Sequence, residues 1–68
     1  MSIYYVNKRA QSNGDHEVHT HECKWLPLEE NRHMLGVFTS CLEAVREAKK
    51  IYRKSNGCAH CCRVCHTS

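Results

Sequence analysis

Four cysteines and two histidines lie in one short segment near the C-terminal end of this 68-residue chain, between Cys58 and His66. The segment contains two Cys-x-x-Cys pairs, Cys58 with Cys61 and Cys62 with Cys65. A Cys-x-x-Cys turn directs two thiolates at one tetrahedral ion, and such pairs are typical of structural zinc sites. The spacing therefore predicts that one of these pairs supplies half of a zinc site.

The second half of the site is expected upstream, where His19 and Cys23 form a His-x-x-x-Cys pair. We expect Cys58 and Cys61 to complete the ligand set, because they directly follow an Asn-Gly turn signal. The four ligands would fill a tetrahedral site and leave the metal a structural role. Other residues stay open as alternative ligands. Cys65 is the first of them and would replace His19. The others are Cys62, His66 and His21.

The elements that must position these ligands can be read from the residue pattern. Residues 3–6 and 16–19 read as two short strands joined by a turn at 11–15, where Asn-Gly supplies a tight reversal. Alternation along the second strand puts Glu17 and His19 on one face and His16 and Val18 on the other. Residues 29–33 are polar, and residues 35–38 read as a third short strand that ends at Thr39.

A helix is predicted at about residues 41–55. Ser40 and Glu43 have the spacing of a capping box at its start. Apolar residues then recur at helical spacing from Cys41 to Tyr52, and Asn56-Gly57 predicts a left-handed stop. Cys41 lies on the apolar stripe, so we expect a core thiol there. The opposite face is basic, with Arg46, Lys49, Lys50, Arg53 and Lys54.

These elements predict one α+β domain over residues 1–68: a β-hairpin, a third short strand, one amphipathic helix and a C-terminal Cys-rich knuckle. A chain of this length buries only about 60% of the surface that its unfolded form exposes. Small domains of this kind usually depend on a metal or disulfides for stability. We therefore expect a bound Zn²⁺ to cross-link the hairpin and the C-terminal segment.

The chain resembles the Ada-like metal-binding fold at several short motifs. The matching pieces are Tyr5-Val6-Asn7, Val18-His19 through Cys23, Phe38-Thr39-Ser40 with Glu43-Ala44, and the cysteine cluster. The resemblance implies that His19, Cys23 and one Cys-x-x-Cys pair bind zinc. In the DNA-repair member of that family a zinc-bound cysteine accepts a methyl group, although many relatives lack this chemistry. This chain departs from the pattern by its longer predicted helix and its doubled terminal thiols.

Composition limits the function classes. No set of nucleophile, base and orienting group is apparent, so we do not expect an enzyme. A net charge of +3 suits a soluble protein and is not the composition of a dedicated nucleic-acid binder. We expect a small interaction module whose unidentified partner is a protein. Two alternatives stay open: nucleic-acid contact through the basic helix face, and a zinc-thiolate methyl acceptor or redox protein.

The sequence also predicts where in the cell the protein is located. No secretory signal or membrane span is apparent, so we expect a cytoplasmic protein in which the cysteines are metal ligands and core thiols rather than a disulfide framework. The Cys62-x-x-Cys65-His66 segment also matches the attachment motif for c-type haem. We disfavour that interpretation because no export signal is apparent and other thiols lie beside it.

Overall fold

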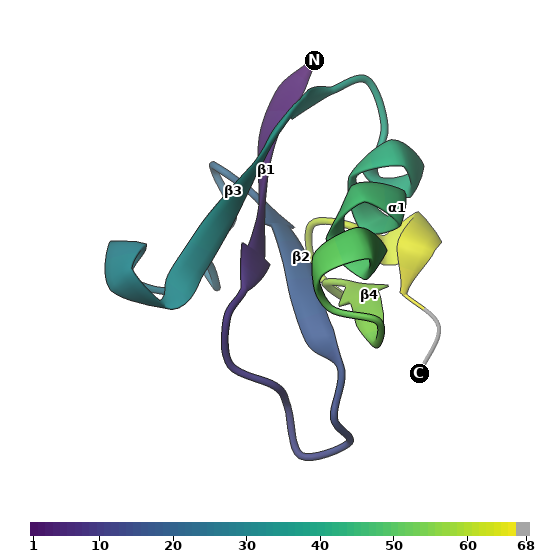
Figure 1. Ribbon diagram of the computed structural model, residues 1–68. Helices are drawn as coiled ribbons and strands as arrows, with labels where there is room; N and C mark the ends of the chain where they lie inside the picture. The colour runs from purple at the N-terminus through teal and green to yellow at the C-terminus, as the bar shows by residue number, and fades with distance from the viewer. Residues whose placement is uncertain (67–68) are drawn as a thin grey trace.

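The β1–β2 hairpin forms as the sequence predicts. In the computed structural model, which describes residues 1–66, β1 (Ser2–Asn7) and β2 (His16–Thr20) pair antiparallel, with Tyr5 opposite His19. Gly14 has a φ of 92°, which is the left-handed geometry expected at the turn between them. The hairpin is the centre of a four-stranded sheet with the order β3-β1-β2-β4 (Figure 1).

Strand β3 (Arg32–Phe38) pairs antiparallel with β1 and begins three residues before its predicted start. The polar residues at its start gave no strand signal because β3 is an edge strand and His33 is exposed to solvent. Arg32 is nevertheless held in place, since its guanidinium lies 4.7 Å from the centre of the Tyr5 ring and donates to the Pro27 carbonyl. The short turn η1 (Glu29–Asn31) precedes it.

Helix α1 (Cys41–Ile51) covers one face of the sheet and is shorter than predicted. Its buried residues, Ala44, Val45 and Ala48, join Tyr4, Val6 and Val18 of the sheet in the core. The helix ends because Tyr52 takes an extended conformation and stacks on the His16 ring, with 3.9 Å between the ring centres. The prediction that the helix continues to residue 55 is therefore wrong.

The start of α1 also differs from the predicted capping box. Glu43 does reach back to the segment before the helix, but it accepts hydrogen bonds from the Thr39 backbone N–H and the Thr39 hydroxyl. Within residues 1–66 the Ser40 side chain makes no capping hydrogen bond. The Glu43 carboxylate thus bonds to Thr39, one position before the predicted cap residue, and within the described residues the reciprocal hydrogen bond to the Ser40 hydroxyl is missing.

Residues expected at the helix end and its left-handed stop instead form β4 (Ser55–Gly57), which runs parallel to β2. Gly57 is extended there, since the positive φ angles among the described glycines belong to Gly14 and Gly36. A Cβ at Gly57 would lie 2.7 Å from the Cys65 Cβ and 2.8 Å from the Cys62 carbonyl oxygen. Glycine is required at this position for close packing rather than for a turn.

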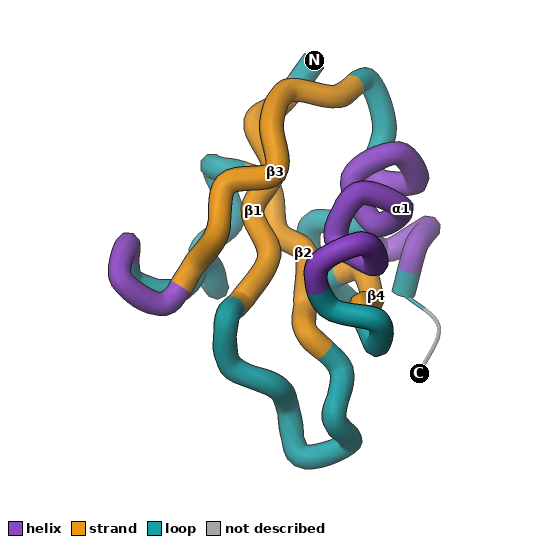
Figure 2. Tube along the Cα trace, viewed as in Figure 1, coloured by secondary structure: helices purple, strands orange, loops and turns teal. Residues whose placement is uncertain are grey.

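The C-terminal segment returns to the side of α1, where it forms the short turn η2 (Arg63–Cys65), as the tube in Figure 2 shows. Cys65 forms a disulfide with Cys41, the first residue of α1. The expectation that Cys41 is a free core thiol is therefore wrong, although its side chain does pack against the core. The α+β class, with one helix and a Cys-rich C-terminal region, is confirmed.

Candidate metal site

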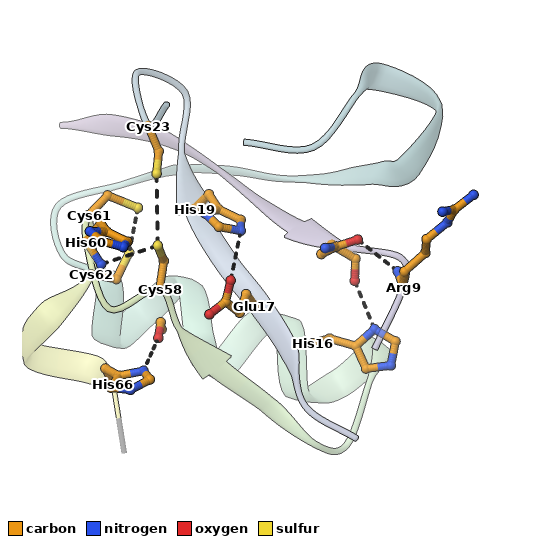
Figure 3. A network of polar contacts seen from close by, with 12 residues as sticks. Arg9, His16, Glu17, His19, Cys23, Cys58, His60, Cys61, Cys62 and His66 are labelled. Atoms are coloured by element: carbon orange, nitrogen blue, oxygen red, sulfur yellow. Dashed lines mark hydrogen bonds and ion pairs between the residues drawn. The ribbon is translucent and has the colours of Figure 1, made fainter. Parts of the chain in front are cut away.

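The four ligands preferred from the sequence lie together in the structure. His19, Cys23, Cys58 and Cys61 each place one potential ligand atom within 4.8 Å of the others. His19 comes from β2, Cys23 from the loop after β2, and the other two from the segment after β4 (Figure 3). The cluster could hold a metal ion, and it would join the hairpin to the C-terminal segment.

The topology explains how residues so far apart in the sequence meet. Because β4 runs parallel to β2, with Val18 opposite Gly57, the chain leaves both strands at the same end of the sheet. Cys58 follows Gly57 directly, and its backbone N–H donates to the Val18 carbonyl at 3.0 Å. The Cys58 sulfur thereby lies 3.9 Å from the Cys23 sulfur, although the two residues are 35 positions apart.

His19 is buried in a form suited to metal binding. Its side chain is 1% exposed, and burial lowers the pKa of the imidazole below its usual range, which favours the neutral ring. Nε2 lies 3.5 Å from a carboxylate oxygen of Glu17. Nδ1 has no hydrogen-bond partner among residues 1–66, which is an unusual condition for a buried nitrogen.

The sulfur atoms of the cluster receive hydrogen bonds from the backbone. The Thr20 N–H donates to the Cys61 sulfur at 3.3 Å, and the His60 N–H donates to the Cys58 sulfur at 3.4 Å. Such donors stabilise a thiolate. Burial has the opposite effect on Cys23 and raises the pKa of its thiol. A bound cation favours the thiolate strongly, so metal binding would release protons from this cluster.

The donor set fits a tetrahedral ion that prefers sulfur. Three thiols and one imidazole are the ligands of Cys₃His structural zinc sites. The unpaired Nδ1 atom of His19 supports this match, because a metal ion would satisfy a buried nitrogen that otherwise lacks a partner. Three of the four predicted positions are also held by backbone hydrogen bonds or an adjacent carboxylate, as a preorganised site requires.

The alternative cysteine ligands lie outside this cluster. Cys65 is bonded to Cys41, so the structure does not offer it as a replacement for His19. Cys62 is a free thiol with 2% exposure that belongs to the hydrophobic core. Burial, followed by the neighbouring Cys61 sulfur at 3.8 Å, raises the pKa of Cys62 to about 12. Cys62 is therefore an apolar core residue at neutral pH.

The alternative histidine ligands have other contacts. The His66 Nδ1 atom donates to the Gly57 carbonyl at 3.0 Å, which fastens the end of η2 to β4 (Figure 3). His21, the nearest rival to His19, lies 3.3 Å from the Tyr5 hydroxyl through its Nδ1 atom. His60 lies on the ligand segment itself, with its ring 5.4 Å from the ring of Trp25.

Two residues of the site were not predicted from the sequence. Glu17 lies on the same strand face as His19 by alternation, and that signal is sufficient to suggest their contact. Trp25 is the kind of large aromatic residue expected in a core, but its side chain is 57% exposed and contacts His60 at the surface. The Trp25–His60 contact joins the loop of Cys23 to the loop of Cys58 and Cys61.

Similarity to known proteins adds no assignment to this site. No protein-family model, curated protein or solved structure matches this chain. The resemblance to the Ada-like fold therefore stays a prediction from the His-x-x-x-Cys and Cys-x-x-Cys motifs. Within residues 1–66, no helix combines the length and the apolar character of a membrane span.

Proposed function

We propose that this protein is a small structural zinc-binding module, with one Zn²⁺ held by His19, Cys23, Cys58 and Cys61. The observation that carries the proposal is the convergence of these four side chains. One of them, His19, also has a buried ring nitrogen with no hydrogen-bond partner among residues 1–66. The resemblance to the Ada-like fold, which implies His19, Cys23 and one Cys-x-x-Cys pair as ligands, supports a site of this kind.

Zinc is favoured over other metals by the chemistry of the donors. Thiolate ligands select soft or borderline metals and disfavour magnesium and calcium, which bind oxygen. Zinc also accepts a mixed sulfur and nitrogen set in tetrahedral geometry without redox chemistry. The chain's own residues prepare the site: Glu17 orients the His19 ring, and the backbone donors to Cys58 and Cys61 stabilise their thiolates.

A structural role follows from the number and burial of the ligands. Four protein ligands fill a tetrahedral ion and leave no position for a substrate, whereas catalytic zinc keeps one position open. His19 and Cys58 are both 1% exposed, which restricts access from solvent. The bound metal would act by fixing the hairpin end against the segment after β4.

The partner that we propose is another protein. The loop between β2 and β3 begins beside Cys23 and exposes two large apolar side chains, Trp25 at 57% and Leu28 at 67%. A metal at Cys23 would anchor this loop and hold both side chains in one arrangement, which is how small metal-stabilised domains present contact residues. We further propose a cytoplasmic location, where a reducing environment keeps ligand thiols available.

The experiment that tests this function is native mass spectrometry of the reduced purified protein, repeated under denaturing conditions. The expected result is a mass gain of one zinc ion that disappears on denaturation. Replacing His19, Cys23, Cys58 or Cys61 with Ala should abolish the gain, whereas the His21→Ala control should retain it. A folded protein that carries no metal in the presence of zinc would overturn the proposal.

A further inference from the structure

One disulfide lies among cysteines that are otherwise reduced. Cys41 and Cys65 are bonded, while Cys23, Cys58, Cys61 and Cys62 are free thiols. In the reducing compartment proposed above, a disulfide beside free thiols is usually reduced and re-formed during function. Cys41 and Cys65 are only half-buried, in contrast to the buried Cys62.

The bond can open without unfolding the segment that carries it. The Cys62 N–H donates to the Cys58 carbonyl at 2.9 Å, and the Cys65 N–H donates to the Cys62 carbonyl at 2.9 Å. The His66 ring adds a hydrogen bond to the Gly57 carbonyl. These contacts are independent of the disulfide, so they hold η2 against β4 when the bond is reduced.

The same segment connects the disulfide to the metal site. Gly57 contacts both Cys62 and Cys65 so closely that a Cβ would collide with both, and Cys58 is the next residue in the chain. The backbone N–H of Cys62 donates a hydrogen bond to the Cys58 carbonyl, and the Cys62 sulfur lies 3.8 Å from the Cys61 sulfur. Reduction would free the Cys65 side chain from Cys41 while the backbone contacts remain, and that side chain packs through Gly57 and Cys62 against the Cys58–Cys61 turn.

We propose that Cys41 and Cys65 form a reversible thiol–disulfide site, and that closure of this bond slows metal release from the His19, Cys23, Cys58 and Cys61 cluster. The second part rests on the proposed zinc-binding function. The co-reactant is a low-molecular-weight thiol such as glutathione. The closed form is the one that the structure shows.

The exchange proceeds in two balanced steps. A glutathione thiolate attacks one sulfur of the disulfide, forms a mixed disulfide and releases the other cysteine as a thiolate, which takes up a proton. A second glutathione thiolate attacks the glutathione sulfur of the mixed disulfide and releases the remaining cysteine thiolate, which is protonated in turn. The sum is one protein disulfide and two glutathione molecules converted to two protein thiols and one glutathione disulfide.

The first test measures the bond alone. The purified protein, with zinc present in the buffer, is equilibrated with mixtures of reduced and oxidised glutathione. Free thiols are then blocked with iodoacetamide, and the peptides of Cys41 and Cys65 are quantified by mass spectrometry. The expected result is a transition from bonded to alkylated cysteines within the range of glutathione mixtures. A pair that stays closed in all mixtures, or open in all of them, would overturn the reversible site.

The second test measures the coupling. Zinc transfer to a chromophoric chelator is timed for the oxidised protein and for protein reduced with a phosphine that is removed before the assay. Coupling between two sites typically changes an equilibrium affinity by roughly 5- to 150-fold. With zinc association unchanged, an affinity change of about tenfold would make release about tenfold faster from the reduced form. In the Cys41→Ala/Cys65→Ala variant, the rate should match the reduced form and should not respond to the phosphine.

The outcomes separate this inference from the proposed function. Equal release rates from two metal-loaded forms would overturn the coupling and leave the zinc site intact. If neither form retains zinc, the proposed function fails and the coupling fails with it, whereas the alkylation result still decides the reversible bond. The coupling is judged from the oxidised and reduced forms of the unmodified protein. Poor folding of the double variant would therefore not change the conclusion about coupling.

Discussion

The Glu17 carboxylate lies 3.5 Å from Nε2 of His19, and the other ring nitrogen is buried without a hydrogen-bond partner among residues 1–66. The contact arises from the strand itself, because residues two positions apart in β2 lie on the same face. A carboxylate at one nitrogen fixes the tautomer and increases the basicity of the other. Glu17 therefore leaves Nδ1 as the ring nitrogen available to a metal.

Glu17→Gln is expected to weaken zinc binding. The amide keeps the size of the side chain but removes the negative charge beside His19, and loss of such an orienting partner typically costs about 10–100-fold in metal affinity. Competition with a chromophoric chelator would measure the change. The control is Glu22→Gln, an exposed carboxylate next to Cys23, which should leave the affinity within about twofold. Equal affinities for the two variants would contradict the role of Glu17.

Cys58 and Cys62 allow a ligand to be compared with a core thiol at equal burial, since they are 1% and 2% exposed. Cys58→Ala should abolish zinc binding. Cys62→Ala should retain one zinc and lose about 1 kcal/mol of stability through the small cavity that it leaves. Metal content and urea unfolding would be measured on both proteins. Loss of zinc from Cys62→Ala with the fold intact would mean that Cys62 is a ligand.

Removal of the metal is expected to unfold the domain at neutral pH. Structural zinc contributes apparent binding free energies of about 10–16 kcal/mol in small domains, which matches or exceeds the total stability of most folds. Circular dichroism with and without a strong chelator would show loss of the helix and sheet signal, and added zinc should restore it. A chelated protein that keeps its spectrum and a sharp thermal transition would contradict this expectation.

Any residual fold of the metal-free protein should lose stability in mild acid. Burial places the folded pKa of His19 below its ordinary value of 6.5. Below that value the unfolded chain binds a proton that the folded chain does not, so stability falls as the pH drops from 6.5 toward the folded pKa. Unfolding free energies in urea between about pH 7.5 and 5 would show the slope. His19→Asn should flatten it, whereas His21→Ala should not.

Gly57→Ala is expected to destabilise the protein, because the added Cβ would lie 2.7 Å from Cys65 and 2.8 Å from the Cys62 carbonyl oxygen. Overpacking of this kind costs roughly 1–3 kcal/mol. Ala59→Ser, at an exposed position two residues later, is the control and should change stability by no more than about 0.5 kcal/mol. Thermal unfolding of both zinc-loaded variants would reveal the difference.

The parts of the fold that could be predicted are those with a local signal. The hairpin has β-branched and aromatic residues around Asn-Gly, and α1 has apolar residues at helical spacing, so both were recognised. The strand β4 was missed because Ser55, Asn56 and Gly57 have low strand propensity and are held only by pairing with β2. The helix end was missed for a related reason, since Tyr52 leaves the helix to stack on His16.

The candidate site was more predictable than the topology that builds it. The spacing predicted a site made of His19, Cys23 and one Cys-x-x-Cys pair, and the position directly after Asn-Gly selected the pair that the structure brings together. The reason for that choice was wrong, because Gly57 lies in β4 rather than in a turn. The disulfide of Cys41 with Cys65 could not be predicted, because no local pattern indicates that η2 folds back onto the start of α1. Such a pairing depends on the path of the whole C-terminal segment.

The contact between Trp25 and His60 has a practical consequence. Trp25 is the only tryptophan of the chain, and its indole lies across the junction of the two loops that carry the cysteine ligands. Its fluorescence therefore arises from one defined place, and separation of the two loops would change both its solvent exposure and its proximity to an imidazole. The protein thus contains a natural optical probe of the spacing between these two loops, and the proposed metal binding could be followed in real time without any attached dye.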